Sequence, residues 1–206
     1  MSRVGVVGLG AMGLGMAKSL RRAGFAPRVF DLRTDVAQAF ARDGGQACAS
    51  LAELGAGSEV VVSVVVNAAQ TESVLFGDDG LATAMAPGSV FVMCSTVDPG
   101  VSVGFEERLA RLGILYIDAP ISGGAAKAAS GEMTMMTAAR PEAYAKAEAV
   151  LEAMAGKVYR LGDRAGAGSK VKVINQLLAG VHIAAAAEAM ALGLREGVDP
   201  AALYEV

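Results

Sequence analysis

A glycine-rich turn directly after a short apolar run constrains this chain more than any other feature. The run covers residues 4–7, all valine or glycine, which is the pattern of a buried strand. The turn consists of Gly8, Leu9, Gly10, Ala11, Met12 and Gly13. In this G-x-G-x-x-G spacing the first glycine permits a tight turn, the second leaves the backbone open to a ligand, and the third lets a helix pack closely on the strand. The spacing predicts a strand–turn–helix unit whose helix begins at residue 13.

The same alternation of strand and helix patterns continues as far as residue 160. Strands are predicted at residues 3–7, 28–30, 60–66, 89–94, 115–118 and 157–160, and helices at residues 13–23, 35–43, 99–112 and 141–154. Helices between successive strands require crossover connections. The pattern therefore predicts an α/β fold with a Rossmann-type, doubly wound and mostly parallel sheet.

A carboxylate at the end of the second expected strand indicates which ligand the turn would bind. A glycine turn that opens a helix is typical of sites for the pyrophosphate of a dinucleotide. Asp31 lies 23 residues after Gly8, where a carboxylate can accept hydrogen bonds from ribose hydroxyls and would repel a 2′-phosphate. Arg33 could bind such a phosphate, so NADP stays open, but Asp31 favours NAD.

The pattern changes after Gly162. Residues 163–168 are rich in glycine, and the sequence is then helical in pattern to about Glu196. A helix of this length resembles a connector between domains. We expect an NAD-binding Rossmann domain at residues 1–163, and at residues 164–206 an interdomain helix followed by the start of a truncated helical domain.

Charge and cysteine content exclude several other classes of function. The 206 residues carry a net charge of −3 without a cluster of Lys and Arg, which argues against a nucleic-acid partner. Cys48 and Cys94 lack metal-ligand spacing, so we expect buried thiols in a cytoplasmic protein and no metal site. Residues 171–194 are long and apolar, but they contain five polar side chains, and we expect no membrane span.

Three motifs carry a resemblance to a known family. They are G-L-G-A-M-G-L-G-M-A-K-S-L at residues 8–20, D-A-P-I-S-G-G-A-A-K-A-A-S-G at residues 118–131, and G-A-G-S-K-V-K-V-I-N at residues 166–175. With them the whole chain resembles the β-hydroxyacid dehydrogenase family, which includes 3-hydroxyisobutyrate dehydrogenases and tartronate semialdehyde reductases. Residues 64–72 and 178–192 are most similar to the branch of this family that oxidises L-threonate.

The resemblance implies roles for two groups of loop residues. Ser122, Gly123 and Gly124 would hold the substrate carboxylate, a task suited to one hydroxyl and two open backbone N–H groups. Asn67 and Thr96 follow two of the expected strands, and they would lie around the nicotinamide and its ribose. Capping or turn formation is the alternative role for these two residues.

The same resemblance places the proton-transfer group on the long helix. Lys172 matches the family's catalytic lysine in the spacing G-x-G-x-x-x-K-x-x-N. A partly buried lysine beside a cationic nicotinamide would have a lowered pKa, so it could accept the proton of the substrate hydroxyl. Asn175, three residues later, would share its helix face and orient the substrate. We expect Lys170 to be solvated and His182, the one histidine, to have no chemical role.

The function expected from the resemblance is NAD-dependent oxidation of a small hydroxy acid, with L-threonate giving 2-dehydro-L-erythronate as the first candidate. Dehydrogenation of 3-hydroxyisobutyrate and reduction of tartronate semialdehyde (2-hydroxy-3-oxopropionate) are alternatives within the family. A non-catalytic NAD-binding or interaction module is the alternative from another class. Family enzymes carry a further helical domain, so the resemblance also implies weak turnover by this chain. Apolar residues of the long helix predict a homo-oligomer: Leu177, Leu178, Val181 and Ile183.

Overall fold

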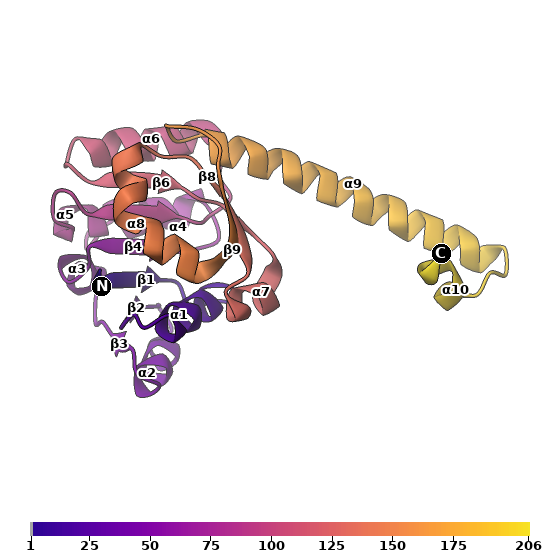
Figure 1. Cartoon of the computed structure of the whole chain (residues 1–206), viewed down its shortest axis with the longest axis horizontal. Coiled ribbons are helices and arrows are strands. Elements are labelled where there is room, and N and C mark those ends of the chain that lie inside the picture. The colour runs from indigo at the N-terminus through magenta and orange to yellow at the C-terminus, as the bar shows by residue number, and fades with distance from the viewer. Residues whose placement is uncertain (1) are drawn as a thin grey trace. The chain divides into compact units, whose positions relative to one another are not determined.

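The computed structural model describes residues 2–206, which fall into two units. The first unit ends at Lys172 and consists of alternating strands and helices (Figure 1). The second unit covers residues 173–206 and contains the rest of one long helix and a short final helix.

The strands of the described chain form two sheets. Their bounds are β1 (Val4–Val7), β2 (Arg28–Phe30), β3 (Gln46–Ala47), β4 (Val60–Ser63), β5 (Val90–Met93), β6 (Leu115–Asp118), β7 (Ile121–Ser122), β8 (Met133–Thr137) and β9 (Ala155–Arg160). The larger sheet has the order β3-β2-β1-β4-β5-β6, and its neighbouring strands are parallel. In the smaller sheet β7 pairs antiparallel with β8, and β8 pairs parallel with β9.

Helices connect the parallel strands. Their bounds are α1 (Gly13–Arg22), α2 (Thr34–Arg42), α3 (Leu51–Ala56), α4 (Ala68–Phe76), α5 (Leu81–Ala84), α6 (Pro99–Ala110), α7 (Gly124–Ser130), α8 (Pro141–Met154), α9 (Ala167–Arg195) and α10 (Pro200–Glu205). The strand order reverses between β1 and β4, and open α/β sheets bind ligands at such a switch point. The predicted Rossmann-type fold is confirmed.

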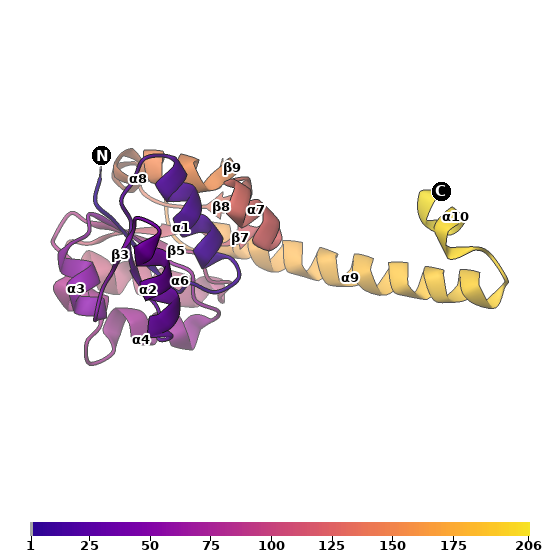
Figure 2. The ribbon, with the colours of Figure 1, turned by 90° about the horizontal axis from the view of Figure 1, so that it is seen from below.

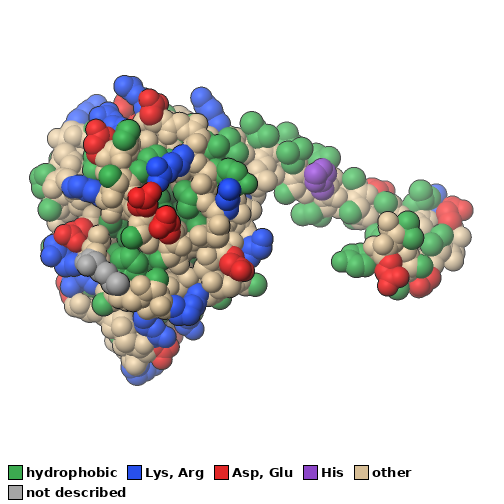
Figure 3. Space-filling view, viewed as in Figure 1, with side chains coloured by type: hydrophobic (Ala, Val, Ile, Leu, Met, Phe, Trp, Pro, Cys, Tyr) green, Lys and Arg blue, Asp and Glu red, His purple; other side chains and the backbone are tan. Residues whose placement is uncertain are grey.

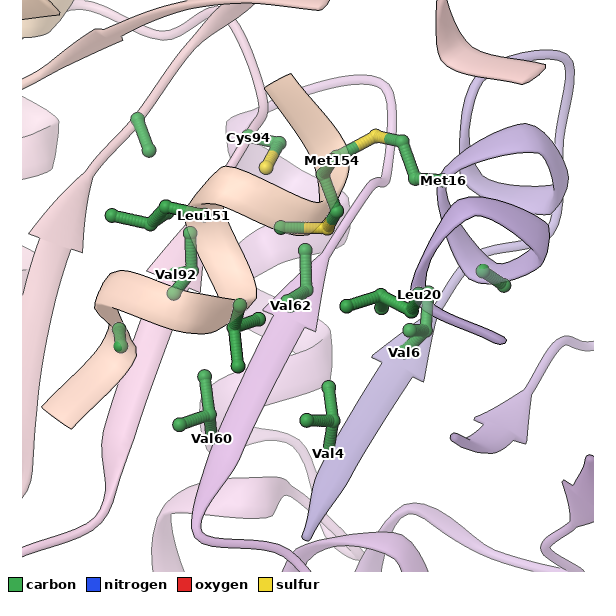
Figure 4. Packing of buried hydrophobic residues seen from close by; sticks show 14 of the residues in the cluster. Val4, Val6, Met16, Leu20, Val60, Val62, Val92, Cys94, Leu151 and Met154 are labelled. Carbon is green, nitrogen blue, oxygen red and sulfur yellow. The ribbon is translucent and has the colours of Figure 1, made fainter. Parts of the chain in front are cut away.

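Both faces of the larger sheet are buried. On β4 the side chains of Val60 and Val62 belong to one apolar core, and that of Val61 belongs to the other. Figure 4 shows the first core, in which side chains of α1 and α8 meet valines of β1, β4 and β5. The second core contains side chains from α3, α4, α5 and α6. Burial on both faces explains why the central strands are almost wholly apolar.

The prediction needs correction at several places. The strand expected at residues 157–160 is part of β9 in the smaller sheet, and the two-residue strands β3 and β7 were not predicted. The strand expected at residues 60–66 ends at Ser63, because beyond this residue polar side chains form hydrogen bonds with the backbone. The N–H of Val66 donates to Oε1 of Gln70, and Asn67 caps α4. The helices α3, α4, α5 and α7 were not predicted. They are short, and an apolar period is difficult to recognise in so few residues.

The start of α1 depends on a missing side chain. A Cβ built on Gly13 would lie 1.8 Å from the carbonyl oxygen of Gly8, whereas one built on Gly10 would meet nothing within 4 Å. The two glycines of this motif are therefore needed for different reasons. Gly13 lets the helix approach the turn, and Gly10 leaves the backbone open.

We predict that Gly13→Ala lowers the free energy of unfolding by about 2–3 kcal/mol, because the backbone must move to relieve the contact with Gly8. Gly10→Ala is the matched control from the same turn and should leave stability nearly unchanged. Chemical denaturation followed by circular dichroism measures both. Equal losses in the two variants would show that close packing at residue 13 does not hold α1 in place.

Candidate active site

The turn after β1 presents backbone donors at the switch point of the sheet. Gly8 has a φ of 87°, and a Cβ on it would lie 2.7 Å from the carbonyl oxygen of Val64. Only glycine therefore fits between β1 and the end of β4. Within the described chain, no acceptor is bonded to the N–H groups of Gly10, Ala11 and Met12. Unpaired N–H groups at the start of a helix are the donors that bind a pyrophosphate.

A cavity of about 450 Å³ opens beside this turn. Its lining includes Gly8, Gly10, Asp31, Leu32, Arg33 and Val66. The side chains of Leu32 and Val66 are exposed and give the cavity apolar walls. Apolar walls with a few convergent polar groups are typical of ligand sites.

Asp31 is the carboxylate of this cavity. Its Oδ2 accepts a hydrogen bond from the N–H of Leu9 at 2.7 Å, and its Oδ1 accepts from the backbone N–H and Nε of Arg33 at 2.9 and 3.1 Å. Burial raises the pKa of Asp31, but the hydrogen bonds from Arg33 and Leu9 outweigh burial and lower the pKa below its ordinary value. The residues present fit an adenine dinucleotide, with N–H donors for the pyrophosphate and a charged carboxylate for the ribose hydroxyls.

The residues expected near the nicotinamide follow the next two strands. Oδ1 of Asn67 accepts a hydrogen bond from the N–H of Gln70 at 2.9 Å, so this side chain caps α4. Thr96 follows β5 and is exposed. The hydroxyl of its neighbour Ser95 donates to the carbonyl of Val65 at 2.7 Å. This bond links the loops after β4 and β5, and it keeps both candidates at the carboxyl edge of the sheet.

The expected substrate loop lies at the start of α7. Ser122 ends β7, and its hydroxyl has no hydrogen-bond partner in the part of the chain that the structure describes. Gly123 and Gly124 have φ values of 137° and 75°, which favour glycine. Figure 2 shows α7 beside α1, and a Cβ on Gly15 would lie 2.7 Å from the backbone nitrogen of Ala129. The fold therefore brings the substrate loop next to the helix that starts at the glycine turn.

Lys172 is a buried lysine near the start of α9. Its exposed fraction is 6%, whereas Lys170, two residues earlier, is exposed as expected. Burial lowers the pKa of Lys172. No carboxylate among the described residues lies within ion-pair distance of its ammonium group. A desolvated lysine without an anionic partner is suited to proton transfer. Asn175, three residues later, is half-buried and belongs to the second unit.

Asp118 received no role from the sequence, although it opens one of the family motifs. Its carboxylate is fully buried at the end of β6 and accepts hydrogen bonds from the start of α9. A carboxylate at the end of an apolar strand is expected to be buried and therefore to need hydrogen-bond donors. This position was the signal in the sequence that could have identified Asp118.

The sequence predicted no chemical role for His182, Cys48 and Cys94. His182 is exposed on α9, where Figure 3 shows its side chain. Cys48 and Cys94 are buried free thiols, and burial raises the pKa of Cys94 to about 12. Across residues 2–206 no group of three or more His, Cys, Asp and Glu side chains could hold a metal ion. By length and composition alone α9 could cross a membrane.

Comparison with known proteins assigns both parts of the chain to dehydrogenase domains. Residues 3–162 match the NAD binding domain of 6-phosphogluconate dehydrogenase. Residues 166–206, which include α9, match the NAD-binding domain of NADP-dependent 3-hydroxyisobutyrate dehydrogenase. The junction between the two matches lies in the glycine-rich segment before α9.

Individual relatives match over the full chain. The L-threonate dehydrogenase of Cupriavidus necator is 65% identical and is matched over 100% of this chain and 70% of its own length. The 3-hydroxyisobutyrate dehydrogenase of Pseudomonas aeruginosa is 37% identical, with 100% of this chain and 69% of the relative covered. The crystal structure of 3-hydroxyisobutyrate dehydrogenase from Salmonella typhimurium has a TM-score of 0.92 and 45% identity, covering 100% of this chain and 72% of that one.

The sequence motifs that carried the resemblance form the glycine turn, the loop before α7 and the start of α9. The matched domain covers most of the first unit, and the relatives match in sequence and in fold. The chain therefore belongs to the β-hydroxyacid dehydrogenase family and is an NAD-binding oxidoreductase.

Proposed function

We propose that this protein oxidises L-threonate at its C2 hydroxyl group to 2-dehydro-L-erythronate. The 65% identity to an L-threonate dehydrogenase supports this substrate. The observation that carries the chemistry is Lys172, a buried lysine with a lowered pKa. A group of this kind can take a hydroxyl proton and return it in the reverse reaction.

Two segments, the loop before α7 and the helix α9, would supply the side chains of the proposed chemistry. Ser122, Gly123 and Gly124 hold the substrate carboxylate through one hydroxyl and backbone N–H groups, and Asn175 orients the reacting hydroxyl. Lys172 accepts the hydroxyl proton while the hydrogen on C2 leaves with its electron pair, so the C–O single bond becomes a carbonyl. NAD, when bound, supplies the acceptor for that hydride. Burial favours the neutral amine that this step requires.

The proposed cofactor is NAD rather than NADP. Its pyrophosphate would bind the turn formed by Gly8, Leu9, Gly10, Ala11, Met12 and Gly13. Asp31 would accept hydrogen bonds from the adenosine ribose, and Asn67 and Thr96 would lie around the nicotinamide and its ribose. The open N–H groups of the turn and the lowered pKa of Asp31 support this arrangement.

Domain limits, location and assembly complete the proposal. The limits are residues 1–163 and 164–206, supported by matches that end at residue 162 and begin at residue 166. A cytoplasmic location agrees with the two free, buried thiols. A homo-oligomer is supported by exposed apolar side chains on α9, among them Leu177 and Ile183.

We predict that the protein with NAD oxidises L-threonate with a higher kcat/KM than 3-hydroxyisobutyrate, measured by the absorbance of reduced cofactor. Tartronate semialdehyde is tested in the reducing direction. A preference for either alternative would replace L-threonate as the substrate. NAD binding in calorimetry without turnover of any acid would favour the non-catalytic module.

Lys172→Met should lower turnover by about 10²- to 10⁴-fold, because no side chain then takes the hydroxyl proton. NAD affinity, measured by calorimetry, should stay the same because the glycine turn and Asp31 are intact. Steady-state kinetics measures the loss of rate.

Lys170→Met is the matched control, since this lysine is exposed on the same helix, and it should turn over at the normal rate. In the unaltered protein, oxidation should speed up as pH rises and Lys172 loses its proton. That rise should begin at lower pH than for an ordinary lysine, because burial lowers the pKa of Lys172. If the rise persisted in Lys172→Met, another group would be the base.

Asp31→Ser should reduce the preference for NAD over NADP by about 10- to 100-fold, because it removes the acceptor for the ribose hydroxyls and the charge that repels a 2′-phosphate. The ratio of kcat/KM for the two cofactors measures the change. Asp35→Ser removes the same charge from an exposed position on α2 and should leave the ratio unchanged. An unchanged ratio in both variants would contradict the role of Asp31.

A further inference from the structure

The Asp118 carboxylate joins the end of β6 to the start of α9. Its Oδ2 accepts hydrogen bonds from the N–H groups of Gly166 and Ser169 at 2.8 and 2.9 Å. Its Oδ1 accepts from the hydroxyl of Ser169 at 2.7 Å. The side chain is fully buried, and no Lys or Arg of the described chain forms an ion pair with it. The donors at the start of one helix thus stabilise this charge.

Backbone contact holds the same helix start against two strands. A Cβ on Gly168 would lie 2.3 Å from the carbonyl oxygen of Met136 on β8 and 3.0 Å from that of Asp118 on β6. No side chain separates the helix from these strands. The helix start cannot slide along them without breaking buried hydrogen bonds, which is costly when the freed groups stay buried.

Asp118 is linked to two residues of the proposed chemistry, to one through its hydrogen-bond partner Ser169 and to the other along the chain. Lys172 follows Ser169 by three residues, a little under one helical turn. Ser122 follows Asp118 by four residues, across the start of β7. Asp118 therefore connects the segment that would hold the substrate to the helix that would take its proton.

We infer that Asp118 is a positioning residue, which fixes the first turn of α9 so that Lys172 is held at the reacting hydroxyl group. The inference rests on the proposed proton transfer by Lys172. Asp118 acts through the helix, since its carboxylate oxygens are already occupied by Gly166 and Ser169.

Asparagine is the conservative replacement. Its oxygen can accept from the two N–H groups, and its NH₂ group can donate to the Ser169 hydroxyl oxygen, so the contacts of Asp118 can be retained without the charge. Alanine removes them all, and Ser169→Ala removes one. These variants form a graded series in the full chain.

We predict that Asp118→Ala lowers kcat by about 100-fold, because a small displacement of a reacting group has an effect of this size. Asp118→Asn should recover most of that loss, and Ser169→Ala should lie between Asp118→Asn and Asp118→Ala. NAD affinity in calorimetry should be the same in all, since the cofactor turn follows β1. Steady-state kinetics gives kcat, and unchanged kcat in Asp118→Ala and Ser169→Ala would overturn the inference.

Tyr116→Phe separates positioning from stability. Tyr116 lies on β6, two residues before Asp118, and its buried hydroxyl is 3.0 Å from Oγ of Ser102. This variant also loses a buried hydrogen bond on the same strand, but the bond is made with α6. Thermal denaturation should show a lower Tm, and kcat should be unchanged. A loss of kcat that followed Tm across all variants would overturn the inference.

A double variant distinguishes failure of the inference from failure of the proposed function. If Asp118 acts through Lys172, then Asp118→Ala with Lys172→Met should be no slower than Lys172→Met alone. Losses that multiply would overturn the inference. A normal rate in Lys172→Met would remove the proposed function and the inference together. If Asp118→Ala does not fold, Ser169→Ala and Asp118→Asn decide, and a normal kcat in Ser169→Ala overturns the inference.

Discussion

The close approach of backbone to backbone at the carboxyl end of β1 is the constraint on which the rest of the site depends. Gly8 fits against the end of β4, and Gly13 brings α1 up to the carbonyl of Gly8. With α1 in this position, α7 packs closely against it, because Gly15 has no side chain where the two helices meet. The absence of side chains at Gly8, Gly13 and Gly15 thus allows the glycine turn and the loop before α7 to lie close together.

Three helices whose first residue is a glycine or proline were predictable from the sequence, whereas α7, which begins at Gly124, was not. The starts of α1 at Gly13, α6 at Pro99 and α8 at Pro141 agree with the prediction, because proline favours the first turn of a helix and Gly13 closes the G-x-G-x-x-G motif. The buried parallel strands were predictable because both of their faces are apolar. Asp31 could be placed in the site because its distance from the glycine turn is characteristic of the fold.

The parts that escaped prediction depend on side chains that act on the backbone of another segment. The end of β4 is set by Gln70 and by the Asn67 cap, so the apolar run through residue 66 was misleading. The place of Asp118 depends on Ser169, which is distant in sequence and adjacent only in the folded chain. Local sequence patterns do not show which distant residues form hydrogen bonds with one another, whereas the folded structure does.

The contact between Asp31 and Arg33 would make ligand binding at this carboxylate an exchange of hydrogen-bond donors. In the proposed role of Asp31, ribose hydroxyls would share or replace the donors that now occupy this carboxylate. The affinity of the proposed site for adenosine would therefore reflect the difference between two sets of hydrogen bonds. Arg33 is the counterion of Asp31, and because the Arg33 side chain is exposed, added salt should weaken this ion pair before it affects the buried parts of the fold.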